Sequence, residues 1–204
     1  GKTAHAASCP QNGVNALNSV IQLFNGIDAL RQHVTPDVRM HGIIVKGGVA
    51  ANIVPDEAVA DFYFRASTKE RVTEVIEKVK KIAEGAALMT GATLEMERYE
   101  LPYDDLKTNE KLSEMFNENL RALGITDINP GKATGGSSDI GNVSHVAPAI
   151  HPYIGITDCP MIGHSVEMAK ATTTKKAHDR LLIAALAMAY TGYDVIVRNE
   201  SLRK

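Results

Sequence analysis

A change of hydrophobic period between residues 57 and 90 constrains the fold of this chain more than any other feature. From residue 57 to residue 65 the side chains alternate: one face carries Ala58, Ala60, Phe62 and Phe64, and the other carries Val59, Asp61, Tyr63 and Arg65. From residue 70 to residue 90 the apolar residues recur at helical spacing, and Gly91 ends this pattern. The stretch therefore predicts a half-buried strand followed by an amphipathic helix, each with one face available for a shared core.

The neighbouring segments extend this pair to a β-α-β-β-α-β order. A strand near His5, a helix from residue 13 to about residue 33 and a strand over 39–46 come before it, and the alternating segment 92–100 follows it. This order is typical of a ferredoxin-like two-layer fold, which we expect to have four antiparallel strands and both helices on one face. We therefore expect an α+β protein whose first domain, residues 1–102, is ferredoxin-like.

Residues 103–204 show a different pattern. Helices are expected from residue 109 to about residue 123 and from about residue 172 to residue 197. The Gly/Ser-rich loop PGKATGGSSDIGN and the apolar segment 149–156 lie between them, and this segment is expected to be a strand. Two helices with one or two strands are too few for an independent α/β domain. We therefore expect residues 103–204 to be the closing part of an α/β domain.

Charge and composition restrict the partners that are expected. The net charge of −2 argues against nucleic acid or an anionic membrane as the main partner, because either would favour a basic protein surface. The longest apolar run, residues 181–190, is about half of what a bilayer-spanning helix needs. No signal-peptide pattern is visible, and Cys9 and Cys159 are too few for a disulfide framework or a cysteine zinc site. These features predict a cytoplasmic protein with no nucleic-acid or membrane partner.

Residue spacing alone does not assemble a complete active site. The opening GKT is not a phosphate-binding loop, because the upstream glycines are absent and Pro10 breaks the helix that such a loop requires. The seven histidines form neither H-E-x-x-H nor H-x-D, and GGSSDIG does not match the G-x-S-x-G nucleophile turn. Two interpretations therefore stay open: an enzyme, or a non-catalytic ferredoxin-like module for binding or dimerisation.

Four ordered segments favour the enzyme. GKTAHAASCPQNGVNAL, GGVAANIVPDEAVADFYFRA, GGSSDIGNVSHVAPAIHPYIGI and IGHSVEM resemble motifs of the dinuclear-zinc aminoacylase and carboxypeptidase G family of metallopeptidases. These motifs are most similar to those of the branch that contains p-aminobenzoyl-glutamate hydrolase and peptidase-like dipeptidases. The resemblance implies a lid, or dimerisation, domain over residues 1–102 and the closing portion of a catalytic domain over 103–204. It also implies a small-molecule amide substrate, either an N-acyl amino acid, an aminobenzoyl-glutamate-like compound or a dipeptide.

The resemblance also assigns roles to particular residues. It implies that His5 donates a hydrogen bond to the scissile carbonyl or its oxyanion, and that Asn52 and Arg65 hold a substrate carboxylate and polarise the amide. Arg65 suits this role because a guanidinium donates two parallel hydrogen bonds to a carboxylate. The alternatives are an ordinary histidine at a strand end and a salt bridge between Arg65 and Asp61. In the Gly-rich loop, the residues expected to contact substrate are Gly135, Gly136, Ser138 and Asp139.

The metal and the assembly follow from the same resemblance. Members of the family use two zinc ions, and His164 in the closing loop corresponds to one of their ligands. The remaining ligands lie in the first half of family members and have no counterpart here, so we expect this chain to be the C-terminal half of such an enzyme and to be inactive alone. The resemblance further implies a homodimer through the lid, with His5 acting in the site of the neighbouring subunit.

Overall fold

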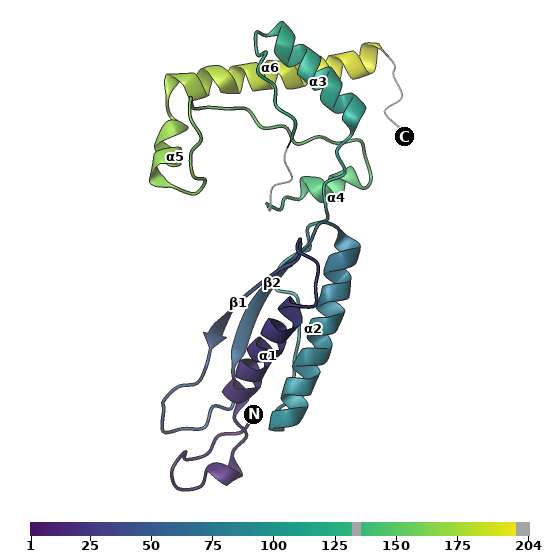
Figure 1. Ribbon diagram of the computed structural model, residues 1–204. Helices are drawn as coiled ribbons and strands as arrows, with labels where there is room; N and C mark the ends of the chain where they lie inside the picture. The colour runs from purple at the N-terminus through teal and green to yellow at the C-terminus, as the bar shows by residue number, and fades with distance from the viewer. Residues whose placement is uncertain (132–135, 199–204) are drawn as a thin grey trace. The chain divides into compact units, whose positions relative to one another are not determined.

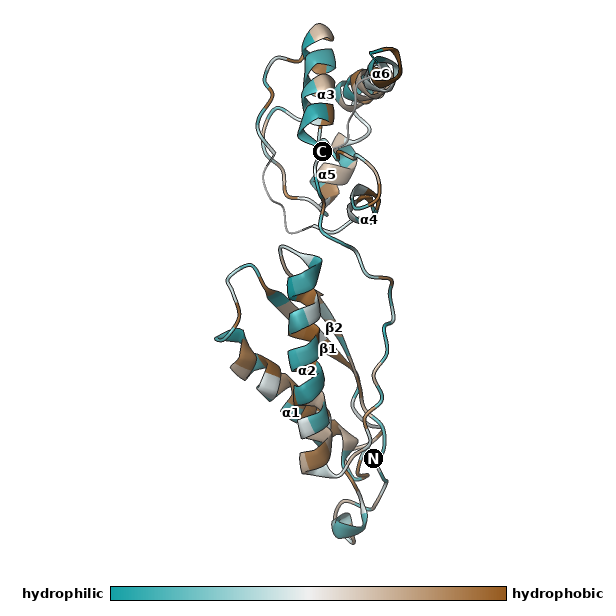
Figure 2. Ribbon diagram, turned by 90° about the vertical axis from the view of Figure 1, so that its right-hand side faces the viewer, coloured by the Kyte–Doolittle hydropathy of each residue, from teal (hydrophilic) through white to brown (hydrophobic). Residues whose placement is uncertain are grey.

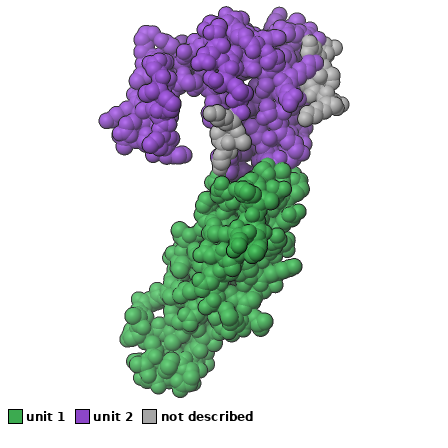
Figure 3. Space-filling model, in the orientation of Figure 1, with its two compact units in different colours: residues 1–102 green, residues 103–204 purple. Residues whose placement is uncertain are grey.

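The computed structural model describes residues 1–131 and 136–198. The chain divides into two compact units, Gly1–Pro102 and Tyr103–Lys204 (Figure 3). Within the described residues, both β-strands belong to the first unit, whereas the second unit is mainly helical.

The sheet of the first unit consists of two antiparallel strands, β1 (Arg39–Lys46) and β2 (Val59–Arg65). Its register pairs Met40 with Phe64, and an irregularity lies between Ile44 and Lys46. The alternation read from the sequence is confirmed, because Phe64 packs against the buried core while the Tyr63 side chain is 43% exposed. We refer to the face that carries Tyr63 as the outer face of the sheet.

Two helices cover the opposite face of this sheet (Figure 1). Helix α1 spans Ala16–Arg31 and helix α2 spans Lys69–Thr90, and both were predicted from their apolar periodicity. Figure 2 shows the hydrophilic side of α2, which points away from the sheet. The helices approach closely at Gly26, where an added Cβ would lie 2.3 Å from Cγ2 of Ile82. A side chain at this position of α1 would therefore push the two helices apart.

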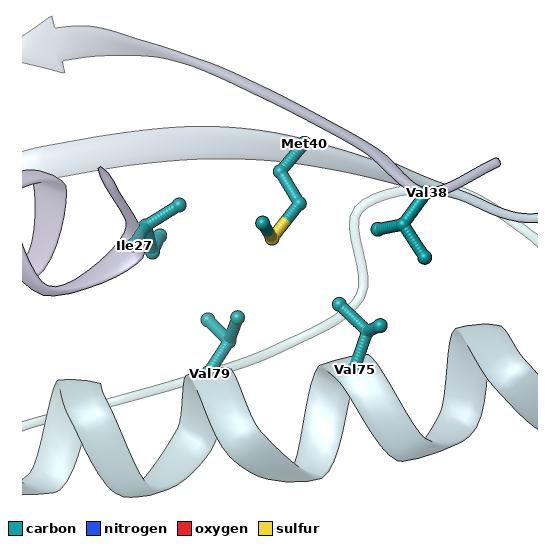
Figure 4. Packing of buried hydrophobic residues seen from close by; sticks show 5 residues of the cluster. All are labelled: Ile27, Val38, Met40, Val75 and Val79. Atoms are coloured by element: carbon teal, nitrogen blue, oxygen red, sulfur yellow. The ribbon is translucent and has the colours of Figure 1, made fainter. Parts of the chain in front are cut away.

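Five buried residues from α1, β1 and α2 and the turn before β1 form the core of the first unit. The cluster consists of Ile27, Val38, Met40, Val75 and Val79, whose side chains point toward one another between β1 and the helices (Figure 4). Phe62 and Phe64 of β2 pack against its margin. Burial of this apolar surface is the main term that holds the helices on the sheet.

The expectation of a four-stranded sheet is wrong for the first unit. The segment around His5 makes only isolated bridges, Lys2 with Val14 and His5 with Ile53, because the short helix η1 (Pro10–Asn12) folds the chain back after a few residues. Residues 92–100 form no strand, although Tyr99 contacts Tyr63. Their apolar positions stay largely exposed, so burial does not favour a continuous pairing there. The α+β class holds, but the regular sheet is half as wide as predicted.

The second unit is mainly helical in the part that the structure describes. The predicted helices are present as α3 (Glu110–Ala122) and α6 (Lys175–Val197), which pack through a core of Phe116, Leu120 and Ala187. Two short helices, α4 (Ile140–Ser144) and α5 (Val166–Ala171), were not predicted, because five or six residues give too little periodicity. The strand expected over 149–156 is wrong, since this segment makes only the parallel bridge between Thr108 and Ala149.

Much of α6 is exposed to solvent. Among the described residues it is the one helix that is long and apolar enough to cross a membrane, which the apolar run 181–190 alone did not suggest. Length and composition are a weak basis for assigning a membrane span, because a core helix of a soluble protein passes the same test.

Candidate functional site

His5 lies on an exposed turn that fixes its neutral tautomer. The backbone N–H groups of Ala7 and Ser8 both donate to Nδ1 of His5, each over 3.2 Å, and the Ser8 hydroxyl lies 3.2 Å from the same atom. A backbone N–H can only donate, so Nδ1 acts as an acceptor and the proton of the neutral ring sits on Nε2. The local fold therefore presents His5 as a hydrogen-bond donor through Nε2–H, as the proposed contact with an oxyanion requires.

The structure brings His5 and Asn52 together, although 47 positions separate them in the sequence. His5 forms its bridge with Ile53, and the Ala6 N–H donates to the Asn52 carbonyl over 3.0 Å. The next bond along, from the Val54 N–H to the Ala4 carbonyl over 2.9 Å, extends this pairing. Both candidate side chains are exposed. The pairing thus places the two positions side by side in the backbone, and we refer to them as the His5–Asn52 patch.

Arg65 lies at the other end of β2. Asn52 belongs to the loop 47–58, which enters β2 at Val59, whereas Arg65 is the last residue of that strand. Seven residues of strand span about 20 Å. This separation exceeds what one dipeptide could bridge, so within one subunit Arg65 is not part of the His5–Asn52 patch.

Arg65 lies over the Tyr63 ring on the outer face. Its guanidinium carbon is 5.8 Å from the ring centroid, and Tyr99 meets the same ring edge-on at 5.7 Å. The hydrogen bond to the Glu100 carboxylate, followed by partial burial and by Tyr99, raises the pKa of the Tyr63 hydroxyl well above its usual range. Tyr63 therefore stays neutral beside Arg65 at physiological pH.

The Gly-rich loop ends in α4, which is tied to the segment 103–108. Of the predicted contact residues, Gly136, Ser138 and Asp139 precede α4, and the Ser138 hydroxyl donates to Asp139 over 3.3 Å. Gly135 lies outside the described residues. Asp139 occupies the N-cap of α4 without a side-chain cap bond. The structure therefore leaves the substrate-contact role of these residues as a prediction.

Three residues that we had not assigned to the site hold α4 in place. Asn142 accepts from the Asp104 N–H over 3.1 Å, Ser144 accepts from the Lys107 N–H over 2.8 Å, and His145 bonds the Asp105 carbonyl over 2.9 Å. In the sequence, the only feature that pointed to them was the polar motif D-I-G-N-V-S-H.

His164 has an unusual backbone conformation. Its φ of 57° makes it the one non-glycine residue with positive φ in the described part of the chain. Such a conformation is costly for a residue with a side chain and is concentrated at functional sites. The next residue, Ser165, caps α5 by accepting from the Met168 N–H over 3.1 Å, which fixes the turn. The exposed imidazole thus lies on a turn that is closed by the Ser165 cap.

The described residues do not fit a zinc centre by themselves. No group of three or more His, Cys, Asp or Glu side chains with metal-binding geometry occurs within residues 1–131 and 136–198. A zinc ion requires about four ligands including water. The described residues therefore offer no complete zinc site, and the role of His164 as a zinc ligand stays a prediction.

Comparison with known proteins identifies the family. A model described as the peptidase dimerisation domain matches residues 1–89, which lie within the first unit. The chain is 36% identical over 205 residues to the human Xaa-Arg dipeptidase, covering 99% of this chain and 47% of that protein. It is 33% identical over 130 residues to a subunit of the p-aminobenzoyl-glutamate hydrolase of Escherichia coli, covering 63% of this chain and 27% of that protein.

A solved structure shows the same fold. The aminobenzoyl-glutamate utilization protein from Klebsiella pneumoniae aligns with a TM-score of 0.62 at 19% identity, covering 96% of this chain and 45% of that one. The dimerisation domain together with these relatives defines a peptidase and amidohydrolase class. The resemblance predicted from the motifs is confirmed: residues 1–89 match the dimerisation domain of a peptidase family, and the chain is similar to dipeptidase and hydrolase relatives, spanning about half the length of the human one.

Proposed function

We propose that this chain forms the lid and the closing catalytic portion of a metal-dependent amidohydrolase. Its substrate would be an N-acyl amino acid, an aminobenzoyl-glutamate-like compound or a dipeptide, since the human relative is named an Xaa-Arg dipeptidase and the bacterial one belongs to a p-aminobenzoyl-glutamate hydrolase. The observation that carries the proposal is the fixed tautomer of His5, because Nε2–H is a donor held on an exposed turn. A preorganised donor of this kind stabilises the charge that develops on an amide oxygen.

The separation along β2 supports a site shared between two subunits. His5 and Asn52 lie at one end of the strand and Arg65 at the other, about 20 Å apart by strand geometry. A two-fold dimer repeats the same surface in the opposite direction, so the His5–Asn52 patch of one subunit can serve the site to which its partner contributes Arg65. The dimerisation domain over residues 1–89 is consistent with this assembly.

Zinc is the metal that we propose, and His164 is its ligand from this chain. A neutral imidazole is a common zinc ligand, and the strained backbone of His164 is the kind of conformation retained for a function. The other ligands do not come from the described residues, so this chain alone is expected neither to bind two zinc ions tightly nor to hydrolyse an amide.

A non-catalytic dimerisation module is the second candidate. The observation that favours it is the match of residues 1–89 to a domain described by dimerisation rather than by catalysis. Zinc analysis of the complete protein separates the candidates, because the enzyme requires bound metal and the module does not.

The direct experiment replaces His5 in the complete protein. His5→Ala should lower kcat by about 10²–10³, the usual cost of losing one oxyanion donor, while the zinc content stays unchanged. His33→Ala is the matched control, because His33 is also exposed in the first unit but lies beyond the end of α1. Equal activity of the His5→Ala variant and the control would show that His5 has no catalytic role.

A further inference from the structure

A surface cavity of about 290 Å³ lies at the turn that joins the end of α1 to the start of β1. This volume is close to the lower limit of about 300 Å³ for sites that bind small molecules. Its lining includes two guanidinium groups, of Arg31 and Arg39, and the imidazole of His41, together with an apolar wall of Val34 and Pro36. Among the described residues that line the cavity there is no carboxylate.

Backbone carbonyls hold both guanidinium groups in place. Nη1 of Arg39 donates to the Pro36 carbonyl and, over 2.8 Å, to the Val38 carbonyl. Nη1 of Arg31 donates to the Met40 carbonyl at the start of β1. A guanidinium has five N–H donors, so these bonds leave Nε and Nη2 of Arg39 and Nη2 of Arg31 to donate to a ligand. Because these donors are ordered before a ligand arrives, less entropy is lost on binding.

The carboxylates nearest to this turn have partners of their own. Asp28 accepts from Nε of Arg31 over 2.8 Å, and Asp37 pairs with Arg71 over 3.0 Å. Among the described residues, the bonds of Arg39 go to carbonyl oxygens rather than to a carboxylate. Two guanidinium groups beside one paired carboxylate give the cavity a net positive charge, which favours an anion.

We propose that this cavity binds a small oxyanion, a carboxylate or a phosphate group, between Arg31 and Arg39. Both groups carry the acceptor oxygens that match the planar donors of a guanidinium, and the exposed His41 ring adds a further donor. Arg65 stands opposite Arg39 in the register, but its guanidinium lies over the Tyr63 ring and is not part of the lining. The site is therefore separate from the proposed contact of Arg65 with a substrate, and it does not depend on the proposed function.

Side-chain NMR of the complete protein tests the site directly. The protein is isotopically labelled in its arginine side chains, and sodium phosphate, sodium acetate and sodium chloride are added separately at equal ionic strength. Phosphate, acetate or both should shift the Nε resonances of Arg31 and Arg39 with a saturating dependence on concentration, whereas chloride should not. The oxyanion that binds more tightly identifies the group that the site accepts. Equal shifts with all three salts would overturn the proposal, because they would report ionic strength alone.

Three variants test whether the guanidinium groups carry the binding. Arg39→Gln, followed at the Arg31 resonance, should weaken the tighter oxyanion about fivefold, the upper end of the range for an exposed ion pair. Arg31→Gln, followed at the Arg39 resonance, should weaken it by a similar factor, so either variant that folds decides the test. Arg98→Gln is the matched control, because it removes an exposed arginine of the first unit that lies outside the cavity, and it should leave the affinity unchanged. Unchanged affinity in a folded Arg39→Gln or Arg31→Gln protein, or an equal loss in Arg98→Gln, would overturn the proposal.

Discussion

Replacing Met40 by alanine tests the core on which the lid depends. Met40 is 3% exposed, and its side chain extends from β1 toward Val79 of α2, with Ile27 of α1 beside it (Figure 4). The substitution removes three side-chain atoms from a cluster of five buried residues, so little neighbouring material can move in to fill the space.

The magnitude follows from burial. Three methylene-sized groups at about 0.8 kcal/mol each account for about 2.4 kcal/mol, and the residual cavity raises the loss to about 3 kcal/mol, within the range for Met→Ala. With a urea dependence of about 2 kcal/mol per molar, the unfolding midpoint should fall by about 1.5 M.

The assay follows amide resonances of the first unit during urea unfolding, so that the second unit does not contribute. Ile43→Ala is the control, because Ile43 lies on the same strand with its side chain 65% exposed, and its loss should cost no more than about 0.5 kcal/mol. If the two variants shift the midpoint equally, Met40 does not join α1 and α2 to the sheet.

Two further predictions concern other anchoring contacts. The carboxylate of Asp37 accepts hydrogen bonds from Ser67 and Arg71. Its pKa lies far below the usual range, and the hydrogen bond from Thr35 contributes most to this shift, followed by those from Ser67. Because the pKa of Asp37 is lower in the folded chain than in the unfolded one, its ionised carboxylate stabilises the fold at pH values above the unfolded pKa, and this stabilisation is lost in acid. The difference in urea midpoint between the unmodified chain and Asp37→Asn should therefore shrink as the pH falls from 6 to below about 4. Asp28→Asn, which removes only a surface pair, should show little such change. In the second unit, a Cβ at Gly141 would lie 2.0 Å from the Asp104 carbonyl oxygen. Gly141→Ala should therefore speed amide hydrogen exchange over 103–108 and in α4. Gly155→Ala is the control: its added Cβ would meet nothing within 4 Å, and it should leave the exchange rates unchanged.

Local periodicity predicted those parts of the fold whose packing it directly encodes. The alternation that puts Phe62 and Phe64 on the core face and the helical repeat of α2 both depend on short-range spacing, and both are confirmed. The same alternation over 92–100 failed, because a strand also needs a partner edge and a buried face, and the apolar Leu94 and Met96 stay exposed. Sequence spacing cannot show whether that partner is available.

The candidate site was predictable in its residue types but not in its geometry. The motifs singled out His5, Asn52 and Arg65, yet only the fold shows that the first two meet through the Ala6–Asn52 bond while Arg65 ends the far side of β2. The tautomer of His5 could not be predicted either, because it depends on two backbone N–H groups that carry no residue-specific signal. Backbone placement, rather than side-chain identity, thus decides what each residue can do.

The central claim is that His5 acts in the site of the neighbouring subunit, where that subunit's own His164 binds metal. The most direct test mixes two variants of the complete protein, His5→Ala and His164→Ala, each expected to be inactive as a pure dimer. A mixed dimer would contain one site with both residues intact, so equal mixing with full exchange of subunits should recover about a quarter of the unmodified activity. Failure to recover activity in mixed dimers whose exchange is verified with two different affinity tags would contradict the claim.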